Sequence, residues 1–319
     1  MKPTNPTNPS KPKTALVTGG AGFIGSHVVE RLVQRGIKTV VLDDLSVGKK
    51  ENLPEASELV IGDICDPLVV KSVLDGVDVV FHLAARVSIR DSFRGLVEDA
   101  GTNVMGTVNL LKHIEETGVK KFIYASSMAT YGDSNYLPID EKHPLDPTSP
   151  YGISKLAGEK YVLCSCRHHG IEPVILRYFN TYGPRQTQTP YVGVITIFIH
   201  KLLNEEDLPI FGTGSQVRDF INVEDVAEAT LLAMDYQGAT NTFNVGTGTG
   251  TDINTLSEIL KDAMNKSVRL NYLSEQPGEP SDSIADISLA KRELGFTPRW
   301  SLREKLPEVV EWNIRKQTQ

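Results

Sequence analysis

The sequence predicts an α/β fold in which a doubly wound parallel sheet is followed by a smaller C-terminal α/β domain. Three observations lead to this prediction. Short apolar runs alternate with longer amphipathic segments from Thr14 to Ile175, a glycine cluster directly follows the first run, and the regular alternation ends after Asn180. The 319 residues are enough for one large and one smaller domain.

The apolar runs of the first half are the predicted strands. They lie at residues 15–18, 39–42, 59–61, 77–81, 122–125 and 173–176. Near-continuous apolar runs separated by helical segments are typical of parallel strands that are buried on both faces. We therefore expect a first domain at residues 14–180, completed by strands that return from about residues 211–246, and a flexible tail at residues 1–13.

The second region is less regular. Pro and Gly punctuate residues 183–193, a helix is predicted at residues 195–203, and short strands are predicted at residues 208–211, 242–245 and 268–272. Open α/β sheets bind ligands outside the carboxyl ends of their strands. We therefore expect residues 181–319 to pack against this edge and to bind mainly the substrate.

Composition narrows the possible partners. A net charge of −7 without a basic block argues against nucleic acid or an anionic membrane as the main partner. No apolar run approaches the roughly 18 to 20 residues of a membrane helix. Cys65, Cys164 and Cys166 form no paired framework and have no partners at metal-binding spacing. We therefore predict reduced thiols, no bound metal and a cytoplasmic location.

A glycine-rich turn follows the first strand. Gly19, Gly22 and Gly25 stand before a predicted helix at residues 27–35, which lets a pyrophosphate approach the helix N-terminus. The next strand ends at Asp43, where a carboxylate accepts hydrogen bonds from the adenosine ribose and repels a 2′-phosphate. The pattern predicts a Rossmann-type domain that binds NAD rather than NADP. The alternative is an ordinary glycine turn beside a solvated aspartate.

Two further strand ends share this edge of the sheet. Asp63, next to Ile64, follows the third strand and is placed to bond the adenine amino group. Leu83, Ala84 and Ala85 follow the fourth strand, where the small alanines allow a close approach to the cofactor. The alternative for the alanines is a tight loop with no contact to the cofactor.

A tyrosine and a lysine lie four residues apart on a predicted helix. Tyr151 and Lys155 therefore share a helix face, which places an ammonium group near a phenol. A tyrosine must lose about three pKa units, or about 4 kcal/mol, to act as a base near pH 7. One positive charge at about 5 Å supplies roughly 3 kcal/mol at a dielectric of 20, so Lys155 and an oxidised nicotinamide together are expected to suffice. The pair alone is a weak signal, because surface helices produce it by accident.

Ser126 and Ser127 strengthen the signal, because they follow the strand at residues 122–125 and so emerge at the glycine-loop edge. A serine hydroxyl there can hold a sugar oxygen and relay its proton. Glycine loop, serine and Tyr-Lys helix together supply the acceptor, donor and base that hydride transfer at a carbinol carbon requires.

The chain resembles the extended short-chain dehydrogenases/reductases, within them the sugar-nucleotide epimerase/dehydratase group, and looks most like UDP-glucose or UDP-N-acetylglucosamine 4-epimerases. The likeness runs from about Thr14 to Leu306. Besides the motifs above, it includes Asn103 in Asn-Val-Met-Gly-Thr, the segment Arg-Tyr-Phe-Asn that ends at Asn180, Arg218 in Arg-Asp-Phe-Ile-Asn-Val-Glu-Asp, and Gln-Pro-Gly-Glu that ends at Glu279.

The resemblance implies a mechanism in which Tyr151 removes the C4 hydroxyl proton while hydride passes to NAD, and hydride then returns to the other face of a 4-keto sugar. Lys155 would tune Tyr151, and Ser127 would orient the sugar oxygen. The implied cofactor contacts are Gly19, Gly22, Phe23, Ile24, Gly25, Asp43, Asp44, Asp63, Ile64, Leu83, Ala84, Ala85, Asn103, Ser126, Tyr151, Lys155 and Tyr178. The implied substrate contacts are Ser88, Ser127, Tyr151, Asn180, Val194, Phe211, Arg218 and Glu279.

Arg218 also has an interpretation from the residues alone. A guanidinium group supplies the local positive charge that an acidic protein needs for a diphosphate. The alternative is a surface ion pair with Asp219 or Glu224.

The residues after Ser127 indicate which reaction to expect. In the related 4,6-dehydratases an acidic pair stands there, and in decarboxylases a glutamate, whereas this chain has Met128 and Ala129. Epimerisation is therefore the expected reaction. The alternatives are a UDP-glucuronate 4-epimerase or decarboxylase, which needs a basic residue near the hexose, and a non-catalytic NAD-binding sensor.

Two departures from the family pattern concern the diphosphate. Gln276 replaces an arginine that many epimerases have, and Ser281 and Asp282 stand where a second basic residue is often found. Diphosphate binding is therefore expected either to be shared with another cation, such as Arg185 or Arg299, or to be weaker than usual. Ser283 stands at the position that limits hexose size, and its small side chain indicates room for an N-acetyl group.

The resemblance also concerns assembly. The helices predicted near residues 92–116 and 149–168 would form a four-helix interface in a homodimer. The alternative is that their apolar faces only cover the sheet.

Overall fold

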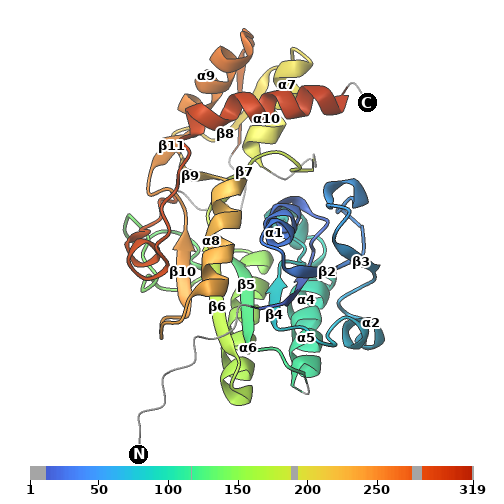
Figure 1. The fold of residues 1–319 in the computed structure, drawn as a ribbon. Helices are drawn as coiled ribbons and strands as arrows, with labels where there is room; N and C mark the ends of the chain where they lie inside the picture. The colour runs from blue at the N-terminus through green and yellow to red at the C-terminus, as the bar shows by residue number, and fades with distance from the viewer. Residues whose placement is uncertain (1–11, 116, 188–192, 275–281, 318–319) are drawn as a thin grey trace, which may run out of the picture.

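The computed structural model describes residues 12–115, 117–187, 193–274 and 282–317. A seven-stranded parallel sheet dominates the first half (Figure 1). Its strand order is β10-β6-β5-β4-β1-β2-β3, so the chain reverses its direction of winding between β1 and β4. The strands are β1 (Thr14–Thr18), β2 (Lys38–Asp43), β3 (Glu58–Ile61), β4 (Val79–His82), β5 (Lys121–Ser127), β6 (Glu172–Tyr178) and β10 (Thr242–Val245). The predicted doubly wound fold is confirmed.

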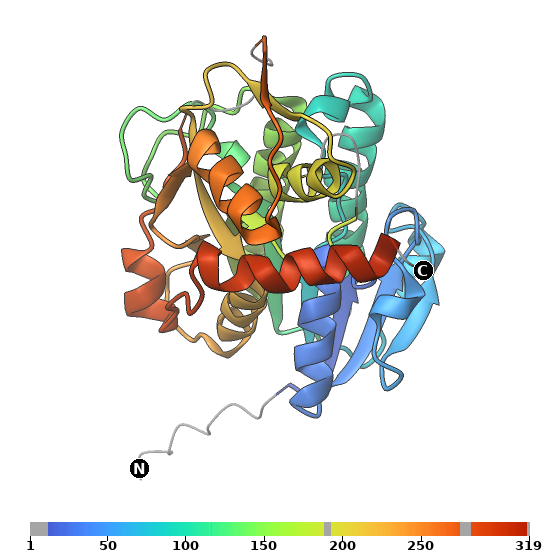
Figure 2. The same ribbon diagram turned by 90° about the horizontal axis from the view of Figure 1, so that it is seen from above.

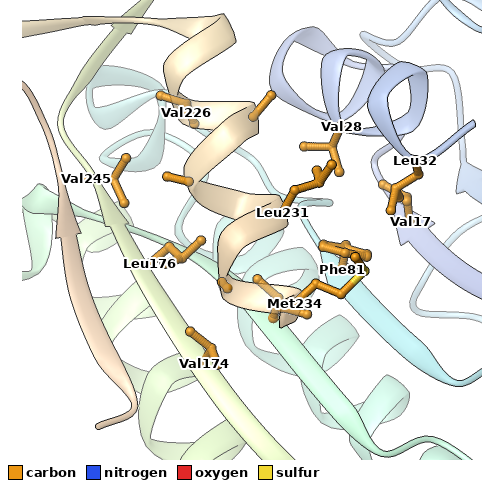
Figure 3. Close-up of a cluster of buried hydrophobic side chains, with 14 of the residues drawn as sticks. Val17, Val28, Leu32, Phe81, Val174, Leu176, Val226, Leu231, Met234 and Val245 are labelled. Atoms are coloured by element: carbon orange, nitrogen blue, oxygen red, sulfur yellow. The ribbon is translucent and has the colours of Figure 1, made fainter. Parts of the chain in front are cut away.

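Both faces of the sheet are covered because successive side chains of each strand point to opposite sides. In β1, Ala15 and Val17 belong to one buried cluster and Leu16 to the other. Helices α1 (Phe23–Gln34) and α8 (Val223–Asp235) cover the first face, where Val28 and Leu231 meet above the strands (Figure 3). The second face carries α2 (Pro67–Ser72), α5 (Thr107–Ile114) and α6 (Pro150–His169).

The helix predicted at residues 149–168, which carries Tyr151 and Lys155, is α6. Ser149 precedes it, and the Ser149 side chain accepts a hydrogen bond from the backbone N–H of Gly152. The helix predicted at residues 92–116 is instead interrupted. It consists of α3 (Ile89–Ser92), α4 (Leu96–Ala100), a π-helical turn at Gly101–Gly106 and α5. Gly95 separates α3 from α4, and α4 begins after it without a side-chain cap.

The second half builds two small sheets. One joins β7 (Asn180–Tyr182), β9 (Val217–Asn222) and β11 (Gly250–Asp252), and the other joins β8 (Leu208–Phe211) to β12 (Leu270–Leu273). Helices α7 (Val194–Leu203), α9 (Ile253–Met264) and α10 (Leu302–Gln317) share a core with them. Within residues 211–246, β10 alone enters the seven-stranded sheet, because β9 pairs with β7 and β11.

The shorter helical turns are the 3-10 helices Lys50–Asn52 and Met128–Thr130 and a π-helical turn at Ala290–Leu294. Seen from above, α10 crosses the molecule toward the end of α1 (Figure 2). Among the described residues, no helix is long and apolar enough to cross a membrane. The predicted tail at residues 1–13 lies outside the described residues except for Pro12 and Lys13.

Candidate active site

A cavity of about 850 Å³ lies where the strands of the large sheet end. Its walls come from both halves of the chain, from the glycine loop after β1 to β8 and β9. Ligands of doubly wound sheets bind at this edge, next to the point where the winding reverses. The cavity is therefore the candidate site.

The glycine loop has the shape that a pyrophosphate requires. Gly19 has a φ of +69°, and a Cβ atom there would lie 2.6 Å from the backbone nitrogen of Ala84. A Cβ atom on Gly25 would lie 2.1 Å from the carbonyl oxygen of Gly19. Helix α1 begins after Gly22 without a side-chain cap, so its first N–H groups remain available to a phosphate. The loop thus fits the pyrophosphate of NAD.

Asp43 closes the loop from the end of β2. Its carboxylate accepts hydrogen bonds from the backbone N–H groups of Ala21 and Leu45, both at 2.9 Å. These bonds fix the carboxylate of Asp43, which is 7% exposed, in the cavity wall. The ribose hydroxyls of a bound dinucleotide would meet it there. The same wall contains the other expected cofactor residues Gly19, Gly22, Phe23, Ile24, Gly25, Asp44, Asp63, Ile64, Leu83, Ala84, Ala85, Ser126, Tyr151, Lys155 and Tyr178.

Tyr151 and Lys155 line the cavity from the first turns of α6. Both are almost fully buried, at 8% and 3% exposure. The backbone N–H of Tyr151 donates to Oγ of Ser92 at 3.1 Å, which anchors the helix start to α3. The ammonium of Lys155 lies 4.3 Å from the ring centre of Tyr124 on β5. The pair is held in a fixed position on two sides.

Burial opposes the charged form of both groups. It raises the pKa of Tyr151 to about 12, although a hydrogen bond with Ser127 acts in the opposite direction. Burial also lowers the pKa of Lys155 to about 8, while Glu159 and Asp99 raise it. The sequence argument expected Lys155 and an oxidised nicotinamide together to activate the phenol. In the protein without cofactor, burial is the largest influence on the pKa of Tyr151.

Ser127 ends β5 next to Tyr151. Its Oγ also accepts a hydrogen bond from the backbone N–H of Ala129 at 3.2 Å, which begins the short helix Met128–Thr130. Met128 and Ala129 line the cavity beside this serine. The wall here is therefore apolar where dehydration would need carboxylates.

The expected substrate residues come from widely separated elements. Ser88 precedes α3, Asn180 begins β7, Val194 begins α7, and Phe211 ends β8. All four line the cavity, as does Arg218 on β9. The carboxylate of Asp219, which the sequence offered as an ion-pair partner for Arg218, instead accepts hydrogen bonds from Thr247, Gly248 and Ala285. Glu279 and Gln276 lie outside the described residues.

Asn103 is absent from the described cavity wall. Its side-chain amide donates to the carbonyl of Arg86, to Asp99 and to Ser154, and its oxygen accepts from the N–H of Arg86. The direct cofactor contact expected of Asn103 therefore stays a prediction. Asn103 fixes the loop after β4 against α6.

The two substitute cations for the diphosphate also lie elsewhere. Arg185 pairs with Glu30 at 2.7 Å, and Arg299 lies 3.9 Å from Glu228. Neither belongs to the described cavity wall. The same holds for Ser283, which is fully buried beside Arg218 and bonds to β9 through its backbone. The expectation that Ser283 limits the size of the hexose stays a prediction.

Four charged residues of the described wall were missed from the sequence. They are Asp99 on α4, Arg86 after β4, and Asp91 and Arg90 on α3. The guanidinium of Arg90 lies 4.5 Å from the ring centre of Phe211. The sequence feature that could have identified these residues is their position shortly after the fourth predicted strand. Because α3 and α4 are separate short helices, sequence periodicity could not place these side chains.

The comparisons with known proteins agree with this geometry. A family model described as the NAD dependent epimerase/dehydratase family matches residues 15–246. A putative UDP-glucose 4-epimerase of Methanocaldococcus jannaschii is 42% identical over 299 residues, covering 93% of this chain and 97% of that protein.

Solved structures share the fold over nearly the whole chain. A UDP-glucose 4-epimerase of Thermotoga maritima with UDP-glucose has a TM-score of 0.92 and 41% identity, covering 96% of this chain and 100% of that chain. A UDP-N-acetylglucosamine 4-epimerase of Methanobrevibacter ruminantium M1, in complex with UDP-N-acetylmuramic acid, has a TM-score of 0.91 and 37% identity, covering 96% and 99%. With the matching family model, the glycine loop and the Tyr-Lys helix, this chain belongs to the NAD-dependent epimerase/dehydratase family, and its cofactor is NAD.

Proposed function

We propose that the protein is an NAD-dependent UDP-sugar 4-epimerase that interconverts UDP-glucose and UDP-galactose or the N-acetylated pair. The observation that carries this proposal is that Tyr151, Ser127 and Lys155 line one cavity together with the apolar Met128 and Ala129. The activity named for the relatives supports it.

Each residue has a defined task. Tyr151 removes the C4 hydroxyl proton and returns it, and Ser127, which bonds Tyr151, holds the reacting oxygen. Lys155 keeps a positive charge near the phenol. NAD, when bound, accepts and returns a hydride and brings a further positive charge while oxidised. That charge offsets the burial that raises the pKa of Tyr151.

The expected cofactor and substrate contacts in the cavity wall, from Gly19 to Arg218, are part of this proposal. Residues 14–180 together with β10 would bind NAD, and residues 181–319 would bind mainly the sugar nucleotide. Arg218, on β9, would hold the diphosphate, because a guanidinium matches the paired oxygens of a phosphate.

A uronate substrate is the second candidate. It requires a cation near the hexose, and Arg86 and Arg90 both line the cavity near Ser88. A non-catalytic sensor is disfavoured, because Tyr151 and Lys155 are both present and both face the cavity.

A homodimer through α4, α5 and α6 is part of the proposal. Large apolar side chains are exposed on α4 (Leu96 at 58% and Val97 at 81%), on the π-helical turn before α5 (Met105 at 60%) and on α6 (Ile153 at 56% and Tyr161 at 50%). Clustered apolar side chains on adjacent helices are typical of protein interfaces. The three free cysteines support a reducing, cytoplasmic location.

Proton NMR with purified protein and added NAD tests the reaction on UDP-glucose, UDP-GlcNAc, UDP-glucuronate and dTDP-glucose. We expect the C4 epimer of UDP-glucose or UDP-GlcNAc, with no loss of water or carbon dioxide. Turnover of UDP-glucuronate alone would favour the second candidate. No turnover by the wild type, with NAD bound, would refute the proposed function.

A further inference from the structure

Glu159 is a buried carboxylate one turn beyond Lys155 on α6, with 1% of its surface exposed. Ser126 Oγ donates a hydrogen bond to its Oε1 at 2.5 Å. Arg177 on β6 donates from Nε to Oε1 at 2.9 Å and from Nη2 to Oε2 at 2.7 Å. This two-point ion pair connects the catalytic helix to two strands of the sheet.

The network continues from Arg177. Its Nη1 donates to the hydroxyl of Tyr131 at 2.9 Å, and that hydroxyl donates to Oδ1 of Asn244 on β10 at 2.6 Å. Asn244 donates in turn to the carbonyl of Ile139 at 2.8 Å. Glu159 therefore stands at the catalytic end of a buried chain that joins β5, α6, β6 and β10.

The register of α6 brings Glu159 near the reaction centre. Tyr151, Lys155 and Glu159 are four residues apart, so they follow one another along one helix face. Consecutive serines of β5 bond to the two ends of this row, Ser127 to Tyr151 and Ser126 to Glu159. The titratable and charged groups facing Lys155 are Tyr151 and Glu159 on α6, Asp99 on α4, His82 on β4 and Tyr124 on β5.

We propose that Glu159 is a positioning residue for the epimerisation, which fixes Ser126 and places a carboxylate one helical turn from Lys155, while Arg177 anchors that carboxylate to the sheet. This inference rests on the proposed function. Glu159 touches neither substrate nor reacting atoms and acts through Lys155 and the end of β5.

The charge balance around Lys155 gives the proposal its direction. Burial lowers the pKa of Lys155 to about 8, and Glu159 is the larger of the two groups that raise it, before Asp99. Without the Glu159 carboxylate, the ammonium would lose its proton at lower pH. A neighbouring opposite charge shifts a pKa by about one unit or more. As the pH is raised, the activity of such a variant should then begin to decline at a lower pH than that of the wild type, because Lys155 loses its charge earlier.

The test compares Glu159→Gln with Lys160→Gln, which removes an exposed charge from the neighbouring position of the same helix. The first readout is the titration of the Lys155 ammonium in cofactor-free protein labelled with ¹⁵N-lysine. The signal is identified by its loss in Lys155→Met. We expect Glu159→Gln to move the midpoint down by about one pH unit, with no change in Lys160→Gln.

The second readout is the pH profile of kcat on the sugar nucleotide turned over by the wild type. In Glu159→Gln, the ratio of kcat at pH 8 to that at pH 6.5 should fall about fivefold relative to wild type, the effect of a shift of about one unit. If the single variant does not fold, Glu159→Gln/Arg177→Met replaces it, because this double variant leaves no unpaired buried charge.

An unchanged Lys155 titration in a folded variant would overturn the inference, as would a loss of kcat that is equal at all pH values. An inactive wild type would instead refute the proposed function. The titration in cofactor-free protein distinguishes the two failures, because it needs no turnover.

Discussion

Replacing Gly25 by alanine should separate the glycine loop from its ligand. A methyl group there would lie 2.1 Å from the carbonyl oxygen of Gly19 and 2.8 Å from Cα of Gly20, both backbone atoms that cannot rotate away. An ordinary contact lies at 3.4 Å or more. The loop and the start of α1 must therefore move apart by about 1 Å, a strain of about 1 to 3 kcal/mol for an overpacked site.

The consequence for NAD follows from this movement. A hydrogen bond to a charged group contributes about 1.5 to 3 kcal/mol, so losing one N–H contact to the pyrophosphate should raise the dissociation constant about 10- to 100-fold. Calorimetric titration with NAD measures this constant, and thermal melting measures the strain. Gly101→Ala is the matched control, because a methyl group on Gly101 meets no atom within 4 Å and its backbone is already helical. If Gly25→Ala bound NAD as tightly as wild type, the pyrophosphate would not lie against this loop.

Three other predictions concern acid stability, assembly and cofactor choice. Burial lowers the pKa of His82 in the folded protein to about 3, so as the pH falls the unfolded chain takes up this proton first. The free energy of unfolding should therefore fall between pH 6.5 and pH 3. Denaturant melts should show a weaker pH dependence of this free energy in His82→Asn than in wild type, and an equal dependence would contradict the prediction. Val97→Asp, on exposed α4, should convert a dimer to a monomer in light scattering, whereas Leu68→Asp on α2, which is also exposed, should not. Asp43→Ala should weaken NAD and narrow its advantage over NADP in calorimetry, because the carboxylate that repels a 2′-phosphate is removed; an unchanged preference would argue against its role.

The large sheet could be predicted because its strands are buried on both faces and leave apolar runs in the sequence. The prediction for the fourth strand was residues 77–81, and the structure has β4 at Val79–His82. The predicted strand stops before the polar His82. In the structure this side chain is buried, and its two ring nitrogens hydrogen-bond to the hydroxyls of Thr18 and Thr107 at 2.7 and 2.8 Å. A local pattern cannot show that a polar side chain finds both of its partners inside the protein.

The candidate site divides along similar lines. Residues at strand ends and in the glycine loop could be placed because parallel strands share one carboxyl edge. Arg86, Arg90 and Asp99 could not, because their position depends on how the short helices α3 and α4 pack. The acidity of Tyr151 was also beyond the sequence, since its raised pKa comes mainly from burial.

The isotope fate at C4 tests the central claim most directly. The protein with NAD would convert UDP-[4-²H]glucose, or the N-acetylated analogue if that is the substrate, and the C4 position of the epimer would be analysed by NMR. We predict that deuterium stays on C4, because the hydride leaves and returns without exchange with water, and that Tyr151→Phe lowers the rate about 10²- to 10⁴-fold. Epimer that carries hydrogen at C4, or a Tyr151→Phe variant with full activity, would contradict the account.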